Sequence, residues 1–418
     1  MNKAGVISKA ESFLWKFLLI LICLRPFISE YVFLTVGSWY IFLLISSSLI
    51  FLAFVGKRVL CPLRLNLWPL LFTIAILVSL LLSGRTQGSL NELYFFIPNI
   101  LIFYIASKIR HEQQRQLLAC VFFTAGIICL YAVYQYFIGL RHTFEYLSPA
   151  QQSSFVGKFL SSRRVFATFI SPNIFASYIV MMLFVSIGLL RSSKGKEELI
   201  YWVGIIAMAL SLVYTKSFGG FLTFLIAFFL FMPHLSSLFR FARANKLWFG
   251  FILIIIVCAI ILICKLFFYS RLSQVFNLNN PDNSIVQRFY YWKTSINMIK
   301  ESPFTGVGWR KFEVLYEFYK PLGANTSHYA HNAFLQILVE TGPLGLVSFL
   351  LIVVTFLRNG LMVIRNSVGH TALKAGLFYA GCAFLMHNII DLSFYFGQAA
   401  FFWWMLAGLF SNFRAEKT

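Results

Sequence analysis

Long apolar runs separated by short polar segments make up almost the whole of this 418-residue chain. A helix that spans a membrane needs about 20 predominantly apolar residues, and twelve runs approach or exceed that length. They cover residues 12–29, 31–55, 66–83, 91–107, 116–139, 166–190, 199–215, 218–238, 247–268, 331–357, 371–390 and 394–412. The pattern predicts an all-α, polytopic membrane protein with about twelve transmembrane helices.

Basic residues gather in every second segment between these runs, beginning before the first run. The groups are Lys3 and Lys9; Lys57, Arg58 and Arg64; Lys108, Arg110 and Arg115; Arg191, Lys194 and Lys196; Arg240, Arg243 and Lys246; Arg358, Arg365 and Lys374; and Arg414 and Lys417. Lysine and arginine favour the cytoplasmic side of a membrane. We therefore expect an even number of spans, with both termini in the cytoplasm.

The longest segment between two predicted spans, residues 269–330, is extracytoplasmic in this topology. It separates helices 1–9, in residues 1–268, from helices 10–12, in residues 331–418, and the three parts form one integrated membrane domain. Apolar residues within it recur at a 3-4-3 spacing that places them on one helical face: Phe289, Trp292, Ile296 and Ile299. We predict an amphipathic helix at the outer membrane–water boundary, ended by Pro303 and Gly306.

The composition supports a membrane protein and excludes two other classes. Hydrophobic residues make up 59% of the chain and charged residues 12%, which is not the composition of a soluble protein. The formal net charge is +21, but the basic residues are distributed in small groups between apolar runs. A nucleic-acid-binding surface would need that charge on one face, so we expect membrane lipids, and no nucleic acid, as partners.

Several polar residues, which are energetically costly to place in a membrane, cluster in the stretch SHYAHNAFLQILVETGPLG, residues 327–345. His328 and His331 lie at the outer mouth of the tenth predicted span, and Asn332, Gln336 and Glu340 follow at i, i+4 spacing down one helical face. A neutral imidazole can take a proton from a hydroxyl nucleophile near pH 7. His331 is either such a base or an interfacial anchor, and Glu340 is either a functional group or a packing contact.

Motifs for several other kinds of chemistry are missing from the chain. There is no D-x-D pair of the kind that would hold a divalent metal on a sugar phosphate, no Walker loop, no H-E-x-x-H and no G-x-S-x-G. We therefore expect arginine and lysine, rather than a metal ion or another cofactor, to neutralise phosphate.

Three segments resemble one known group of proteins. HNAFLQILVETGPLGL is similar to the H-N-x7-E-x-G signature of the O-antigen ligase and O-antigen polymerase superfamily (the Wzy_C type), and RFYYWKTSINMIKESPFTGVG resembles its R-x3-W segment and P-x-x-G-x-G turn. RVFATFISPNIFASYI, which contains Asn173, resembles a third element, before one of the middle spans. Together these segments cover about residues 165–190 and 285–345.

The resemblance implies a glycosyltransferase of the GT-C class, with its active site on the periplasmic side of the cell inner membrane. Such enzymes transfer a glycan from undecaprenyl pyrophosphate to an acceptor hydroxyl, with inversion and without a metal. His331 then matches the catalytic base and Arg288 an arginine that binds the donor's pyrophosphate. The remaining matches to the signature, with His328 beside them, are Asn332, Glu340 and Gly342.

The chain departs from the family pattern at one position. The family carries a second pyrophosphate arginine in an R-x3-L element, where this chain reads TKSFGGFL with Phe218 at the arginine position. Lys216, two residues away, supplies a positive charge without the bidentate fork of an arginine. Arg163 and Arg164 are alternative sources of that charge.

Several functions fit these observations. O-antigen ligation to lipid A-core is favoured, and polymerisation of repeat units or glycosylation of a protein Ser or Thr uses the same chemistry. A rival from another class is a lipid-linked oligosaccharide flippase, which predicts charged residues along a central cavity. The polar residues here concentrate instead at one outer face.

Overall fold

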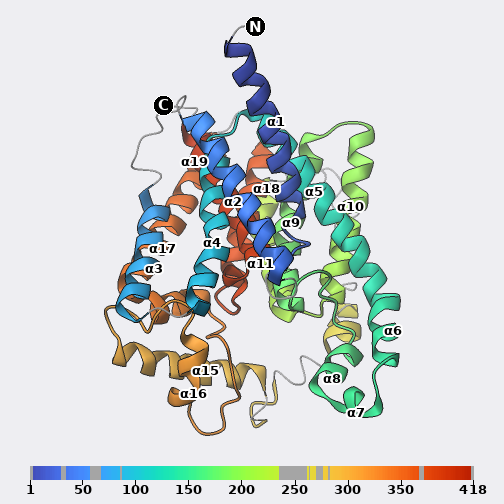
Figure 1. Ribbon diagram of the computed structural model, residues 1–418. Helices are drawn as coiled ribbons and strands as arrows, with labels where there is room; N and C mark the ends of the chain where they lie inside the picture. Colours follow the sequence, from blue (N-terminus) through green and yellow to red (C-terminus); the bar gives the residue numbers. More distant parts are fainter. Residues whose placement is uncertain are drawn as a thin grey trace.

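The computed structural model describes residues 3–29, 34–56, 67–84, 87–234, 261–262, 264–269, 276–280, 283–366 and 371–415. Within these ranges every regular element is a helix and there is no β-strand. The all-α prediction is therefore confirmed for the described part of the chain (Figure 1).

Long helices form the bundle. They are α1 (Lys3–Leu24), α2 (Leu34–Gly56), α3 (Leu67–Leu82), α4 (Gln87–Ala106), α5 (His111–Tyr134), α9 (Pro172–Ser192), α10 (Lys196–Tyr214), α11 (Phe218–Phe231), α17 (Ala333–Asn366), α18 (Thr371–His387) and α19 (Gly397–Ala415). Each overlaps one predicted span, and most of the span predicted at 247–268 lies outside the described residues. Six described helices are long and apolar enough to cross a membrane. The protein is thus a multi-pass membrane protein, and the count of twelve spans stays a prediction.

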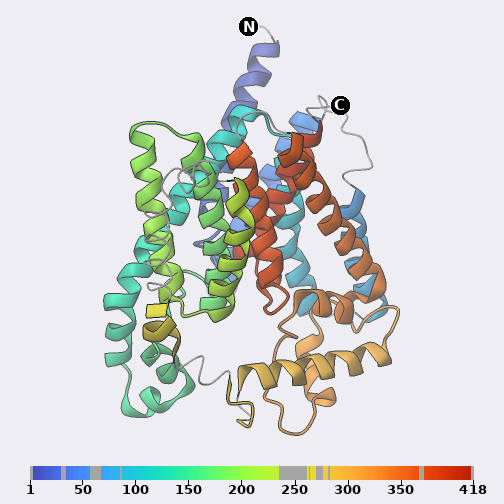
Figure 2. The ribbon, with the colours of Figure 1, turned by 180° about the vertical axis from the view of Figure 1, so that it is seen from behind.

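Shorter helices lie between the long ones. They are the π-helix η2 (Gln135–Gly139), α6 (Leu140–Glu145), α7 (Pro149–Ser153), α8 (Phe155–Ser161), η3 (Met232–His234), η4 (Cys264–Phe268), α15 (Ser284–Glu301), α16 (Phe312–Tyr319) and η5 (Ser393–Tyr395). The start of α1 and the end of α19 lie at one end of the bundle, whereas α15 and α16 lie across the opposite end (Figures 1 and 2). That second end is called the α15 end below.

Glycines allow the central helices to approach closely. Helix α9 is buried along nearly its whole length and packs against α10, α18 and α19. A Cβ atom added to Gly376 of α18 would lie only 2.6 Å from the Phe184 carbonyl oxygen of α9, and one added to Gly408 of α19 would lie 2.3 Å from the Phe103 carbonyl oxygen of α4. Small residues at such interfaces let backbones pack in a membrane bundle, which fixes how the helix ends that carry the site are arranged.

The helix predicted within the loop is present as α15 and ends just before Pro303, as expected. Phe289 and Ile296 are 60% and 50% exposed, whereas Trp292 and Ile299 of the same predicted face are partly buried. Helix α15 also contacts α16 and α17. The loop is therefore an ordered layer over the end of the bundle, and its place at a membrane boundary stays a prediction.

A break in α17 joins that layer to the bundle. Gly342 has φ 65° and ψ −170°, and the next residue, Pro343, has no N–H to donate. The carbonyl oxygens of Val339 and Glu340 consequently lose their helical partners and accept instead from the backbone N–H groups of Val307 (2.8 Å) and Gly308 (3.1 Å). This exchange satisfies buried carbonyls that would otherwise be costly and fixes the loop against the first part of α17.

Replacing Gly342 with valine is expected to destabilise the protein by at least about 3 kcal/mol, because a left-handed φ is costly for a β-branched residue. In addition, a Cβ atom at this position would lie 2.3 Å from the Phe304 carbonyl oxygen. Thermal unfolding of the purified protein in detergent measures the effect. Gly126→Ala in α5 is the matched control, since its added Cβ meets nothing within 4 Å; equal stability of the two variants would contradict this account of the break.

Candidate active site

His331 occupies a strained backbone position immediately before α17. Its φ is 50°, a left-handed conformation that costs a non-glycine residue about 1 kcal/mol or more. The following residues are tied down: the Asn332 side-chain oxygen accepts from the Leu335 N–H (3.0 Å), and the Ala333 N–H donates to the Asn388 carbonyl (2.9 Å). Strain of this kind persists only where the surroundings determine it, so the backbone conformation of His331 is set by its neighbours.

The imidazole of His331 faces the carboxylate of Asp391, in the loop between α18 and η5. Nδ1 of His331 lies 4.0 Å from Oδ1 of Asp391, and the histidine side chain is 34% exposed. Nδ1 itself is buried and makes no hydrogen bond within the described structure. The exposed part of the ring therefore excludes Nδ1, and Nε2 is the nitrogen left for a substrate. The Asp391 carboxylate thus faces the imidazole on the side of Nδ1, without a direct hydrogen bond.

The charges around this pair favour a neutral imidazole and an ionised carboxylate. Burial lowers the pKa of His331 below its ordinary value of 6.5; Asp391 opposes this shift and Arg288 adds to it. Burial by itself raises the pKa of Asp391, but His387, His331 and Arg288 together hold that pKa below its ordinary value. At neutral pH His331 can thus accept a proton, beside a carboxylate that is ionised.

Helix α15 brings Arg288 to the same place. The ring of Tyr291, three residues further along α15, lies 5.4 Å from the His331 ring, and residues at this spacing share a helical face. Arg288 acts electrostatically on both His331 and Asp391, yet it makes no hydrogen bond or ion pair with a described residue. A guanidinium in this position remains available to an anion.

The other predicted cations lie around the turn from α10 to α11. Nη2 of Arg164 donates to the Asn173 side-chain oxygen (2.9 Å), Nε of Arg164 donates to the Thr215 carbonyl (3.1 Å), and Nζ of Lys216 donates to the Ser162 carbonyl (2.7 Å). Arg164, Lys216 and Asn173 are therefore brought together. Phe218, at the family's arginine position, is the first residue of α11.

His387 connects this turn to the His331 site. A Cβ atom added to Gly219, near the start of α11, would lie 3.6 Å from Nε2 of His387, which is the last residue of α18. His387 is 1% exposed, and its Nδ1 makes no hydrogen bond within the described residues. It precedes Asp391 by four residues, so the two clusters lie on neighbouring elements at one end of the bundle.

Three predicted companions of His331 lie away from its ring or make structural contacts. His328 is 66% exposed, and its Nδ1 lies 2.5 Å from the Glu313 carboxylate of α16, so it forms a separate surface pair. Asn332 caps the start of α17 through Leu335. Glu340 is 1% exposed within α17 and accepts from the Gln336 side chain. The catalytic and binding roles expected for the site residues stay predictions.

Sequence reasoning did not name Asp391, His387 or Tyr291 as site residues. The available signal was the segment HNIID, residues 387–391, where three polar residues interrupt two apolar runs. Arg310 was also missed: it pairs with Glu92 of α4 (3.0 Å) and is only 10% exposed. These residues come from segments far apart in the chain, and only the fold brings them to the same end.

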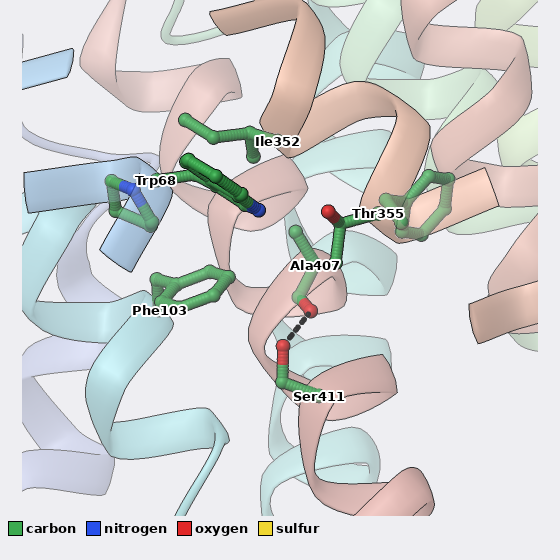
Figure 3. Close-up of a pocket in the computed structure, with 8 residues that line it drawn as sticks. Trp68, Phe103, Ile352, Thr355, Ala407 and Ser411 are labelled. Carbon is green, nitrogen blue, oxygen red and sulfur yellow. Dashed lines mark hydrogen bonds between the residues drawn. The ribbon is translucent and has the colours of Figure 1, made fainter. Parts of the chain in front are cut away.

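A small cavity elsewhere in the bundle does not belong to this site. Trp68, Phe103, Ile352 and Ser411 line it, and the Ser411 hydroxyl donates to the Ala407 carbonyl of its own helix (Figure 3). The cavity volume is about 10 Å³, far below the roughly 300–1,000 Å³ of typical ligand pockets. Ile352 also lies nine residues beyond Pro343, or about 14 Å along the helix axis.

The apolar bundle and the polar groups at its α15 end define a polytopic membrane protein with a candidate base and an available arginine. A family model described as O-antigen ligase matches residues 203–350, a range that includes Lys216, Arg288, His331 and Glu340. The chain is also 25% identical, over 310 residues, to the exopolysaccharide production protein ExoQ of Rhizobium meliloti (strain 1021). That match covers 72% of this chain and 66% of the relative, slightly less than two thirds of its length. The resemblance to the O-antigen ligase and polymerase superfamily is confirmed.

Proposed function

We propose that this protein is an inverting, metal-independent glycosyltransferase of the inner membrane. It transfers a glycan from undecaprenyl pyrophosphate to an acceptor hydroxyl at the periplasmic face. The observation that carries the proposal is the arrangement of His331: Nδ1 is buried toward Asp391, whereas the rest of the ring is partly exposed beside Arg288. This arrangement supplies a base and a phosphate-binding charge in one place.

In the proposed reaction, Arg288 binds the pyrophosphate of the donor, with Lys216 or Arg164 contributing further positive charge. Nε2 of His331 takes the proton of the acceptor hydroxyl as its oxygen attacks the anomeric carbon. The bond from that carbon to the pyrophosphate oxygen breaks, and undecaprenyl pyrophosphate leaves with the bonding electrons. Asp391 holds the ring and stabilises the imidazolium that forms.

The same chemistry can serve more than one acceptor molecule. The O-antigen ligase description of the matching family model favours ligation, for which we propose lipid A-core as acceptor. The exopolysaccharide production protein among the relatives favours a second candidate, in which the acceptor is another glycan and the product a polymer. Transfer to a protein hydroxyl would use the same residues.

Reconstitution tests this function. The purified protein is placed in vesicles with a labelled undecaprenyl-pyrophosphate glycan, with either lipid A-core or free repeat units as acceptor, and with EDTA throughout. A new glycosidic bond that forms despite the chelator is the expected result. Movement of the label across the bilayer without bond formation would instead identify a flippase, and transfer that stops in EDTA would contradict the metal-independent mechanism.

A further inference from the structure

Buried hydrogen bonds connect Glu340 to the backbone just before His331. The Ala330 N–H donates to Oε1 of Gln336 (2.6 Å), and Nε2 of Gln336 donates to Oε1 of Glu340 (2.9 Å). Ala330 and Gln336 are 0% exposed and Glu340 is 1% exposed. Water does not reach these groups, so their hydrogen bonds come from protein partners. Besides Gln336, the Glu340 carboxyl group also interacts with Arg310 and Tyr395.

The donors and acceptors in these two hydrogen bonds can be assigned unambiguously. A backbone N–H can only donate, so the oxygen of the Gln336 amide must face Ala330. The NH₂ of the same amide then points one helical turn along α17, where Glu340 offers an acceptor. The far end is anchored as well, because the Glu340 carbonyl accepts from the Gly308 N–H (3.1 Å) and the Ser79 hydroxyl (2.5 Å).

The contact at Ala330 holds the backbone at the residue immediately before His331. The ties at Asn332 and Ala333 hold the chain after His331. Before it, the Ser327 hydroxyl bonds to Tyr329 and to the Tyr291 side chain of α15, and the Arg310 guanidinium lies 3.5 Å from the Tyr329 hydroxyl. Gln336 therefore connects the segment before His331 to the body of α17, and His331 is held from both sides in its left-handed conformation.

We propose that Gln336 and Glu340 are positioning residues for His331: the pair fixes the backbone so that the imidazole faces Asp391 and Arg288. This inference rests on the proposed function, in which His331 is the base. It also assigns a role to the buried Glu340 carboxylate, which accepts from the Gln336 amide and keeps it oriented without touching substrate.

The test uses variants of similar size that either remove the hydrogen bonds of Gln336 or exchange donors for acceptors between Gln336 and Glu340. Gln336→Leu removes the connection and should lower kcat by about 100-fold, the cost of a misplaced catalytic group, with KM for the donor little changed. Glu340→Gln keeps an acceptor oxygen for Gln336 and should stay near wild type. Gln336→Glu sets two acceptors against each other and should be impaired, whereas the exchange Gln336→Glu with Glu340→Gln restores one acceptor and one donor and should recover most of kcat.

Rates are expressed per folded molecule, quantified by size exclusion and thermal unfolding in detergent. Ser348→Ala is the matched control: Ser348 is buried in the second half of α17, and among the described residues its hydroxyl bonds only carbonyls of its own helix. A second readout does not depend on transfer. Carbethoxylation of His331, followed by peptide mass spectrometry, should be several-fold faster in Gln336→Leu, because the ring is then no longer held against Asp391.

The possible results separate cleanly. Wild-type kcat in Gln336→Leu, or an exchanged pair no better than Gln336→Leu, would overturn the proposal, and so would unchanged carbethoxylation. If the wild-type protein forms no glycosidic bond, the proposed function fails, and the carbethoxylation rates alone decide whether Gln336 and Glu340 position His331.

Discussion

Replacing His331 with asparagine is expected to lower glycan transfer by about 1,000-fold, within the range that general-base catalysis contributes. Asparagine is chosen because it tolerates the left-handed backbone at this position better than alanine does, and φ is 50° here. Its amide cannot accept the proton of a hydroxyl at neutral pH. The variant should therefore fold and bind donor but fail in the chemical step.

Transfer of labelled glycan in vesicles, with donor binding measured separately, checks this expectation. The matched control is His328→Asn, which removes a histidine of the same motif that is exposed and paired with Glu313; it should retain wild-type activity. Transfer by His331→Asn at the wild-type rate would show that His331 is not the base. Equal losses in the two variants would point to a structural role of the whole motif.

The resemblance to the O-antigen ligase and polymerase superfamily predicted His331 and Arg288 as partners, because each stands in a short segment that matches one of its motifs. The structure places them at the same end of the bundle, with Tyr291 of α15 against the His331 ring. The bend at Gly342 and Pro343 could also be predicted, since both residues disfavour a regular helix. Local chemistry of this kind can be read from a single segment.

Asp391 illustrates what a single sequence does not reveal. It lies 60 positions after His331, and the loop that carries it is placed by long-range contacts such as the bond from Ala333 to Asn388 (2.9 Å). Pairing across that separation depends on how α17, α18 and α19 pack. A lone aspartate between apolar runs has no spacing pattern that would name its partner.

The two roles left open for Glu340 could not be separated from the sequence for a similar reason. Helical spacing placed Gln336 and Glu340 on one face, and the hydrogen bond between their side chains (2.9 Å) agrees with it. The function of that bond depends on Ala330, which lies before the helix in a loop whose path no periodicity describes. The same holds for Val307 and Gly308, whose bonds to α17 join residues more than 30 positions apart.

Replacing Asp391 with asparagine should lower kcat by about 100-fold or more, since a neutral amide neither fixes the imidazole nor stabilises the imidazolium formed during transfer. The shape of the pH profile should change in a defined direction. The pKa of His331 is already below 6.5 because of burial, and Asp391 is the group that raises it. Without that carboxylate the pKa falls further.

Transfer by the wild-type protein is therefore expected to be constant near pH 7 and to decline as the pH falls through the lowered pKa of His331. In Asp391→Asn the decline should begin at lower pH, even though the plateau rate is smaller. The matched control is Glu313→Gln, which removes a carboxylate facing the exposed His328 and should change neither plateau nor profile. A decline that moves to higher pH in Asp391→Asn, or does not move, would mean that the carboxylate acts on something other than the imidazole of His331.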